Sequence, residues 1–128
     1  NLSLSIINQI DINEIRLKRI ENANYLLKGI SMNSNITPIY KSINMNDCPL
    51  FLPVILRAGN RDSVKKHLSE NNVYCPIHWP KSEIHKLNQK SEFIYDHILS
   101  IICDQRYSHG DMNRIIEILR DPKIDLKC

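Results

Sequence analysis

The chain contains a short apolar run that ends abruptly in polar and aromatic side chains, Val73-Tyr74-Cys75-Pro76-Ile77-His78-Trp79-Pro80. A second run of the same kind follows it, Ile98-Leu99-Ser100-Ile101-Ile102-Cys103-Asp104-Gln105-Arg106-Tyr107. Both patterns predict a short buried strand with chemically capable residues at its exit. A rigid sheet can hold such side chains in fixed directions, so we expect the chemistry of the chain at these two strand ends.

A third strand is predicted at residues 50–56, which are almost all apolar. Pro53 cannot donate a ladder hydrogen bond, so this strand is expected at a sheet edge or with a bulge. Residues 37–43 are compatible with one more short strand. Helical patterns fall at about 61–71, where Val64 and Leu68 are predicted to face inward, and around 92–97. Short strands with helices between them predict an α/β fold, here an α+β two-layer sandwich with a small three-stranded sheet packed by helices.

A helix is predicted over residues 5–28, where a wide apolar stripe repeats every three to four residues. Gly29 follows a basic last turn and is the expected stop. We therefore divide the chain into a long connecting helix, residues 1–30, and a small α/β C-terminal domain, residues 31–128, as one structural unit.

The last helix has a clear start signal, because Ser108 is followed three residues later by Asp111 in a near relative of the capping box. Its predicted buried face consists of Met112, Ile115, Ile116 and Leu119.

Composition narrows the classes of function. The 128 residues carry a formal charge of +3, with basic and acidic residues interleaved, which argues against a nucleic-acid partner. No apolar stretch approaches the roughly 20 residues that a membrane helix needs. The four cysteines form no CxxC pair, so we expect no metal site and a reduced, cytoplasmic protein. The first residue is Asn, and we expect the chain to be a piece of a longer protein.

Three candidate residues follow the two predicted strands, His78 and Trp79 after the first and Arg106 after the second. His78 lies between two prolines that restrict its sweep, so it either meets a ligand or is a surface histidine. Trp79 is either a packing anchor or an aromatic wall of a pocket. Arg106 either binds a carboxylate or phosphate, or pairs internally with Asp104 or Asp111. Phosphate-cradling glycine loops and GxSxG or HExxH motifs are absent from the sequence, and we assign no catalytic residue.

Several segments, taken in order, resemble the C-terminal small domain of the DegT-type sugar aminotransferases, in the aspartate-aminotransferase superfamily of pyridoxal-phosphate enzymes. Arg16 with Asn22, Leu26 and Leu27 resembles the connecting helix of that family. The matching segments that follow are residues 49–56, 61–73, 74–80, 98–102 and 111–119. The chain departs from the family pattern at Ile102, where a proline is usual, and at residues 104–107.

The resemblance implies a PLP-dependent (pyridoxal-phosphate-dependent) aminotransferase acting on a keto-sugar or a small carboxylated substrate. It implies that the cofactor is held in the parent protein by an N-terminal large domain missing here, and that this chain alone binds no cofactor and is not active. The parent is expected to be a homodimer. The implied substrate-binding residues are His78 and Arg106, with Trp79 and Tyr107 as walls.

A different class of function stays open from the sequence: an independent interaction module that docks a protein partner through the apolar face of the first helix. A nucleic-acid-binding sandwich is disfavoured, since the strands lack the surface aromatics, interleaved with basic residues, on which bases stack.

Overall fold

The computed structural model describes residues 2–33, 35–57, 61–78 and 81–121. Along these residues run the helices and strands α1 (Leu2–Ile7), α2 (Ile12–Ile30), β1 (Ile36–Pro38), β2 (Phe51–Leu56), α3 (Arg61–Glu70), α4 (Gln89–His97), β3 (Ile98–Ile102) and α5 (His109–Leu119). None of the described helices has the length and apolar character that crossing a membrane requires.

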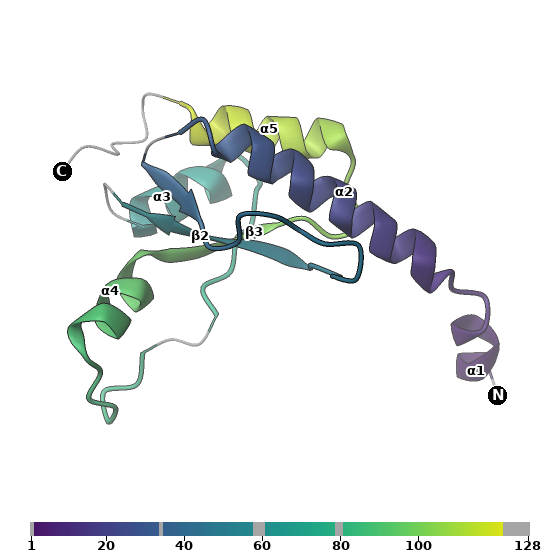
Figure 1. The fold of residues 1–128 in the computed structure, drawn as a ribbon, viewed down its shortest axis with the longest axis horizontal. Coiled ribbons are helices and arrows are strands. Elements are labelled where there is room, and N and C mark those ends of the chain that lie inside the picture. The colour runs from purple at the N-terminus through teal and green to yellow at the C-terminus, as the bar shows by residue number, and fades with distance from the viewer. Residues whose placement is uncertain (1, 34, 58–60, 79–80, 122–128) are drawn as a thin grey trace.

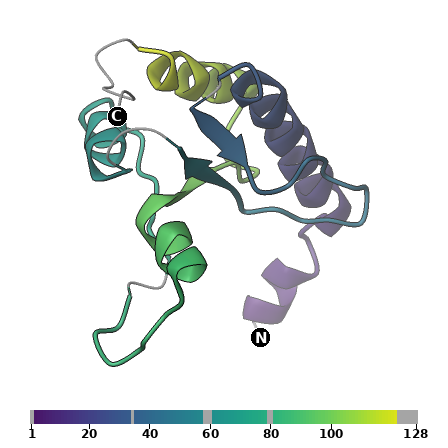
Figure 2. The ribbon, with the colours of Figure 1, turned by 60° about the vertical axis from the view of Figure 1, so that its left-hand side comes forward.

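The strands form one antiparallel sheet in the order β1-β2-β3. Burial alternates along β2, where Leu52, Val54 and Leu56 are buried and the residues between them are half-buried. One face of the sheet therefore points into the core, and α2, α3 and α5 pack over it (Figures 1 and 2). The helical core side chains are Ala23, Leu26, Ile30, Val64, Leu68, Met112, Ile115, Ile116 and Leu119. The predicted α+β two-layer fold and the predicted inner faces of α3 and α5 are confirmed.

The prediction that Pro53 marks an edge strand or a bulge is wrong. β2 is the central strand, and its pairing with β3 runs without interruption from Phe51 to Ile55. The Pro53 carbonyl accepts a hydrogen bond from the Ile39 N–H at 3.0 Å. The hydrogen-bonding edge of Pro53 therefore faces the β1 side of the sheet and not β3. β1 ends at Pro38, opposite Val54. The missing N–H of Pro53 thus falls beyond the end of β1 and leaves the β2–β3 ladder intact.

The predicted strand over residues 73–77 is also wrong, because the segment is extended chain without a strand ladder. The Ser100 N–H donates to the Pro76 carbonyl at 3.4 Å, so the segment lies alongside β3. Pro76 has no N–H to donate in return. Val73 and Cys75 are buried, which explains why the apolar pattern resembled that of a strand.

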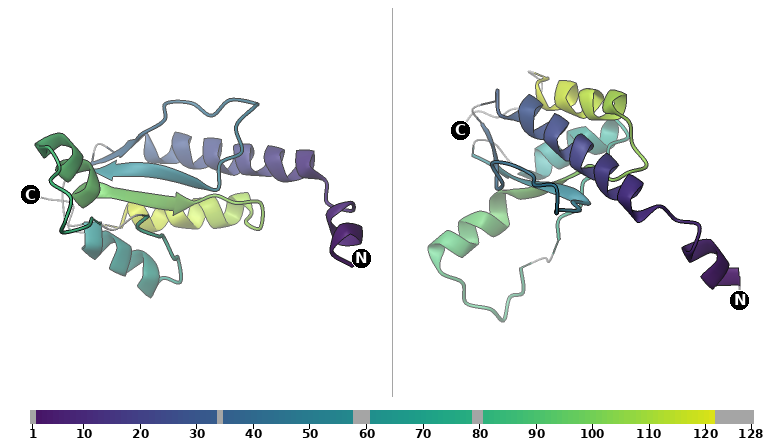
Figure 3. Two further views of the ribbon diagram at one scale, coloured as in Figure 1. Left: turned by 90° about the horizontal axis from the view of Figure 1, so that it is seen from below. Right: turned by 45° about the vertical axis from the view of Figure 1, so that its right-hand side comes forward.

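The predicted first helix is in fact two. α1 ends at Ile7, and α2 starts after Asp11, whose side chain accepts hydrogen bonds from Asn13 N and Glu14 N at 2.9 and 3.0 Å. This N-cap fixes the new start, because it satisfies backbone donors that a continuous helix would have satisfied itself. The first part of α2, together with α1, extends away from the rest of the fold (Figure 3, right).

Gly29 does not stop the helix, which continues to Ile30. The residue lies where α2 meets α5, and a Cβ atom added to it would be 2.2 Å from Cδ1 and 2.8 Å from Cγ1 of Ile116. Glycine is therefore needed here for close helix packing and not for a left-handed backbone. In contrast, Asn72 does adopt a positive φ of 58° just after α3, as expected for a residue at a helix exit.

We expect Gly29→Ala to destabilise the protein by up to about 2 kcal/mol, because overpacking costs about 1–3 kcal/mol and alanine gains about 1 kcal/mol in helix propensity. In an Ile116→Ala background the clash is gone, so the same substitution should become neutral or stabilising. Urea denaturation of the four proteins measures both effects. Equal destabilisation in the two backgrounds would show that packing against Ile116 is not the cause.

The local start signals are confirmed where they are strongest. Ser108 and Asp111 form a reciprocal capping box at the start of α5. α4 begins three residues before the predicted turn at 92, because the Asn88 side chain accepts from Ser91 N at 2.9 Å and caps the helix there.

Candidate functional site

A cavity of about 770 Å³ lies on the face of the sheet that the helices leave open. The segment that follows β1 runs along one edge of this face, and α4 lies at one end of it (Figure 3, left). The floor is made by Phe51 and Pro53 of β2 and by Ile98 and Ser100 of β3. The remaining lining residues are Tyr40, Ser42, Ile43, Asn44, Asp47, Cys48, Pro49, Leu50, His78, Ile94 and Tyr95. A partly open cavity with apolar walls and a few polar groups is the usual form of a small-molecule site.

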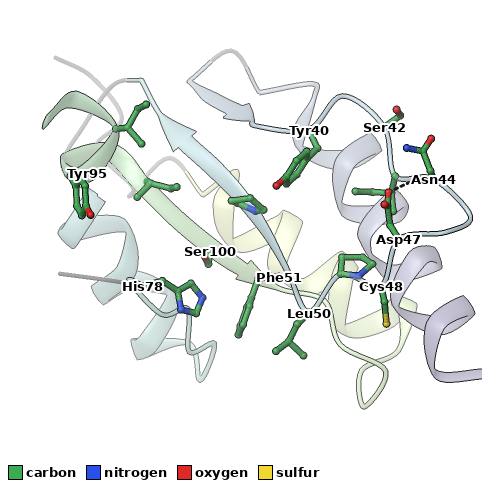
Figure 4. A pocket seen from close by; sticks show the side chains of 15 residues that line it. Tyr40, Ser42, Asn44, Asp47, Cys48, Leu50, Phe51, His78, Tyr95 and Ser100 are labelled. Atoms are coloured by element: carbon green, nitrogen blue, oxygen red, sulfur yellow. Dashed lines mark hydrogen bonds between the residues drawn. The ribbon is translucent and has the colours of Figure 1, made fainter. Parts of the chain in front are cut away.

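His78 is exposed and lines this cavity from the end of the 73–78 segment. Its ring meets the ring of Phe51 edge-on, with centroids 4.8 Å apart and an interplanar angle of 64°. Figure 4 shows the imidazole beside Phe51 on one side of the cavity, with Tyr40 and Asp47 on the other. The phenyl contact holds one part of the imidazole, and the exposed nitrogens can meet a ligand.

Arg106 lies in the turn after β3, where it pairs with the buried carboxylate of Asp104. Arg106 Nε lies 3.1 Å from both carboxylate oxygens, and Nη2 lies 2.5 Å from Oδ2. The backbone N–H of Arg106 also donates to Asp104 Oδ1 at 2.9 Å. The side-chain hydrogen bond from Arg106 lowers the pKa of the Asp104 carboxyl, and the same contact raises the pKa of Arg106. Of the alternatives for Arg106, the internal pair with Asp104 is therefore formed.

Two residues of α2 hold this turn against the helix. Asn22 is fully buried, and its Nδ2 donates to the carbonyls of Asp104 and Tyr107, each at 2.9 Å. Arg19 Nε donates to Gln105 Oε1 at 2.7 Å. Sequence reasoning did not assign these roles. The available signal was an asparagine within the apolar stripe of the helix, next to the buried Ala23.

Two of the described cysteines, Cys75 and Cys103, are buried and poorly suited to act as nucleophiles. Burial raises the pKa of Cys75 to about 11 and that of Cys103 to about 12. Cys48 is exposed, and these three thiols are free. No cluster of metal-ligating side chains occurs among the described residues.

No model of a known protein family matches the sequence, and no curated protein matches it. Solved structures match the fold. The sugar aminotransferase CalS13 from Micromonospora echinospora matches with a TM-score of 0.74 and 13% identity, over 93% of this chain and 33% of CalS13. A DegT DnrJ EryC1 StrS aminotransferase from Brucella abortus matches with a TM-score of 0.64 and 17% identity, over 82% of this chain and 30% of that enzyme.

A third match is the E. coli GDP-4-keto-6-deoxy-D-mannose-3-dehydratase with bound hydrated PLP, with a TM-score of 0.67, 13% identity and coverage of 84% of this chain and 31% of the dehydratase. The chain has the fold of one part of these enzymes. It spans 30 to 33% of their length. The resemblance to sugar aminotransferases predicted from the sequence is confirmed as a likeness of fold.

Within this aminotransferase-like fold, the three predicted substrate-binding residues that the structure describes do not all line the cavity. His78 lines the cavity, whereas Arg106 and Tyr107 are not among its lining residues. Tyr107 is half-buried against the core, and the guanidinium carbon of Arg106 lies 5.8 Å from its ring centroid. Trp79 lies outside the described residues. The cavity contains polar groups that sequence reasoning did not single out, above all Asp47 and Tyr40.

Proposed function

We propose that this chain is the small-domain part of a PLP-dependent aminotransferase that acts on a keto-sugar or a small carboxylated substrate. The observation that carries the proposal is the match of 93% of the chain to one third of a sugar aminotransferase. The parent protein would hold the cofactor in a larger domain outside this chain and would work as a homodimer in the cytoplasm.

The described residues that line this cavity do not fit the cofactor itself. Covalent attachment needs a lysine and the phosphate needs several donors, but the cavity lining includes no lysine or arginine. When bound in the parent, the cofactor supplies the electron sink for amino-group transfer. This chain would supply substrate contacts.

His78 is the best placed of these contacts, because its exposed imidazole can donate to or accept from a substrate hydroxyl or carbonyl. Arg106 keeps an exposed outer side, with a side chain that is 69% exposed, although Asp104 neutralises much of its charge. We propose that Arg106 contacts the substrate from a second position, with Tyr107 and Trp79 as walls.

The test uses the longer protein that carries this segment. We expect a product of about three times this length, with the absorbance of a bound PLP cofactor and aminotransferase activity. His78→Ala should lower kcat/KM by about 2- to 10-fold, since a hydrogen bond to a neutral substrate group contributes about 0.5–1.5 kcal/mol. His85→Ala is the matched control, because His85 is an exposed histidine that does not line the cavity.

Arg106→Ala in the same protein tests the second position. Full activity of both the His78→Ala and Arg106→Ala proteins, with the fold intact, would contradict the site assignment. A purified longer protein that holds no PLP would contradict the aminotransferase assignment itself.

A second candidate function is the interaction module that docks through the apolar face of the first helix. The observation in its favour is the exposure of Ile7, Ile10, Ile12 and Leu17, which are 43 to 73% exposed. Scattered single apolar residues on a surface need no explanation, but neighbouring ones indicate a contact face. Sedimentation of the pure chain tests this candidate, and a clean monomer at high concentration would argue against it.

A further inference from the structure

We propose that the cavity on the open face of the sheet binds an organic ammonium ion, with the charge at the Asp47 carboxylate and the body of the ligand over the apolar and aromatic lining. This inference rests on the proposed function and narrows it, because the cavity is the one that His78 lines and its charge disfavours the carboxylated alternative among the proposed substrates. It names the charge that the cavity selects, which neither the fold nor the similar structures specify.

The charged and aromatic groups of the lining support a cationic ligand. Asp47 is its acidic residue, and no lysine or arginine lines the cavity. Tyr40, Phe51 and Tyr95 line the same cavity, with Tyr40 on the side of Asp47 and Tyr95 at the opposite end (Figure 4). The faces of such rings carry negative potential and attract ammonium groups, most strongly where water is partly excluded.

The Asp47 carboxylate is held in place by its own turn. Its Oδ2 accepts a hydrogen bond from the Asn44 N–H at 2.7 Å, and the Asp47 N–H donates to the Asn44 carbonyl at 3.1 Å. Oδ1 accepts no hydrogen bond from the described residues, so it is available to a donor on the ligand. A fixed carboxylate loses less side-chain freedom on binding than a mobile one.

Two arginines near the cavity are directed elsewhere. Arg19 Nη1 lies 3.5 Å from Cys48 Sγ at the edge of the cavity, but its Nε donates to Gln105 in the turn after β3. Arg61 pairs with Asp62 at 3.0 Å and donates to the backbone carbonyl of Tyr95. Within the described residues, no ion pair joins either arginine to Asp47.

The apolar surface of the cavity fixes the rest of the ligand. Leu50, Pro53, Ile94 and Ile98 provide walls and floor for a hydrocarbon body. An anionic ligand such as a phosphate ester would meet the Asp47 carboxylate without a lining cation to offset it. The favoured ligand therefore combines an ammonium group with an apolar or ring-shaped body.

The experiment compares three probes of similar shape on the 128-residue chain at neutral pH and low salt: benzylammonium, benzyl alcohol and phenyl phosphate. Amide chemical shifts of the cavity residues report binding. We expect benzylammonium to bind about fivefold tighter than benzyl alcohol, as for one partly exposed charge pair, and phenyl phosphate to bind most weakly. Asp47→Asn should remove the preference for the cation.

Two further variants keep the test decisive. Glu70→Gln removes an exposed carboxylate on α3, away from the cavity, and should leave the preference unchanged. Phe51→Leu should weaken binding of all three probes. The same spectra show whether each variant is folded. The inference is wrong if phenyl phosphate binds as well as benzylammonium, if Asp47→Asn keeps the preference, or if no probe binds at about 10 mM. These measurements need no cofactor and no turnover. The ammonium-binding proposal can therefore be wrong while the aminotransferase proposal holds, and the aminotransferase proposal can be wrong while the cavity still binds the cation.

Discussion

Replacement of Asn22 by leucine is expected to lower the free energy of unfolding by about 3 kcal/mol. Asn22 is fully buried, and its Nδ2 hydrogen-bonds the carbonyls of Asp104 and Tyr107. Leucine has a similar volume but no donor. Each carbonyl that loses its partner in a buried place costs about 1–3 kcal/mol. Part of this loss is offset, because leucine also removes the Asn22 Oδ1 atom, which is buried without a hydrogen-bond partner among the described residues.

The measurement is urea denaturation of the wild type, Asn22→Leu and the matched control Asn24→Leu. Asn24 lies on the same helix and is exposed, so its replacement should change stability by less than about 0.5 kcal/mol. For a chain of this size we expect Asn22→Leu to lower Tm by roughly 10 °C. Similar small effects at both positions would show that the Asn22 hydrogen bonds do not hold the turn.

The parts of the fold that depend on local sequence were predictable. Ser108 and Asp111 lie three residues apart and cap α5 by direct contact, so the signal and the structure involve the same short segment. The same is true of Val64 and Leu68, whose spacing places both on the inner face of α3. Strand 98–102 was also predicted with its observed bounds.

The errors arose where one residue type serves two purposes. A glycine after a basic helical turn usually ends the helix, but Gly29 instead allows α5 to approach α2. Only the position of Ile116, far away in the sequence, distinguishes the two cases. Pro53 is similar, because a proline is tolerated in a central strand when the neighbouring strand stops short of it. Neither the position of Ile116 nor the end of β1 can be predicted from the residues around Gly29 and Pro53.

The candidate site was predicted in part for the same reason. His78 follows an apolar segment, and this pattern correctly indicated a buried segment with an exposed end. Tyr40 lay in the possible strand 37–43, but β1 ends at Pro38, and Asp47 belongs to a polar connection with no periodic pattern, so the local sequence did not place either side chain at the cavity. The sequence left two alternatives for Arg106, and only the geometry showed the pair with Asp104.

The Asp104–Arg106 pair leads to the second large effect, which depends on pH. We expect Asp104→Asn to lower the free energy of unfolding by about 1–2 kcal/mol near neutral pH, since hydrogen bonds to a charged group contribute about 1.5–3 kcal/mol and solvent around Arg106 reduces that contribution. Asparagine retains an oxygen that can accept from the Arg106 N–H. The substitution therefore removes mainly the charge and the second carboxylate oxygen.

The sign of the pH dependence follows from the lowered pKa of Asp104 in the folded protein. A carboxyl group of this kind stabilises the fold fully above its unfolded-state pKa of about 3.9, and this contribution disappears as the pH falls through the lower folded-state pKa. The stability difference between wild type and Asp104→Asn should thus be constant from about pH 5 to 8 and shrink below about pH 4. In an Arg106→Gln background this change with pH should largely vanish. A difference that persists unchanged into acid would mean that the charge of Asp104 does not stabilise the turn.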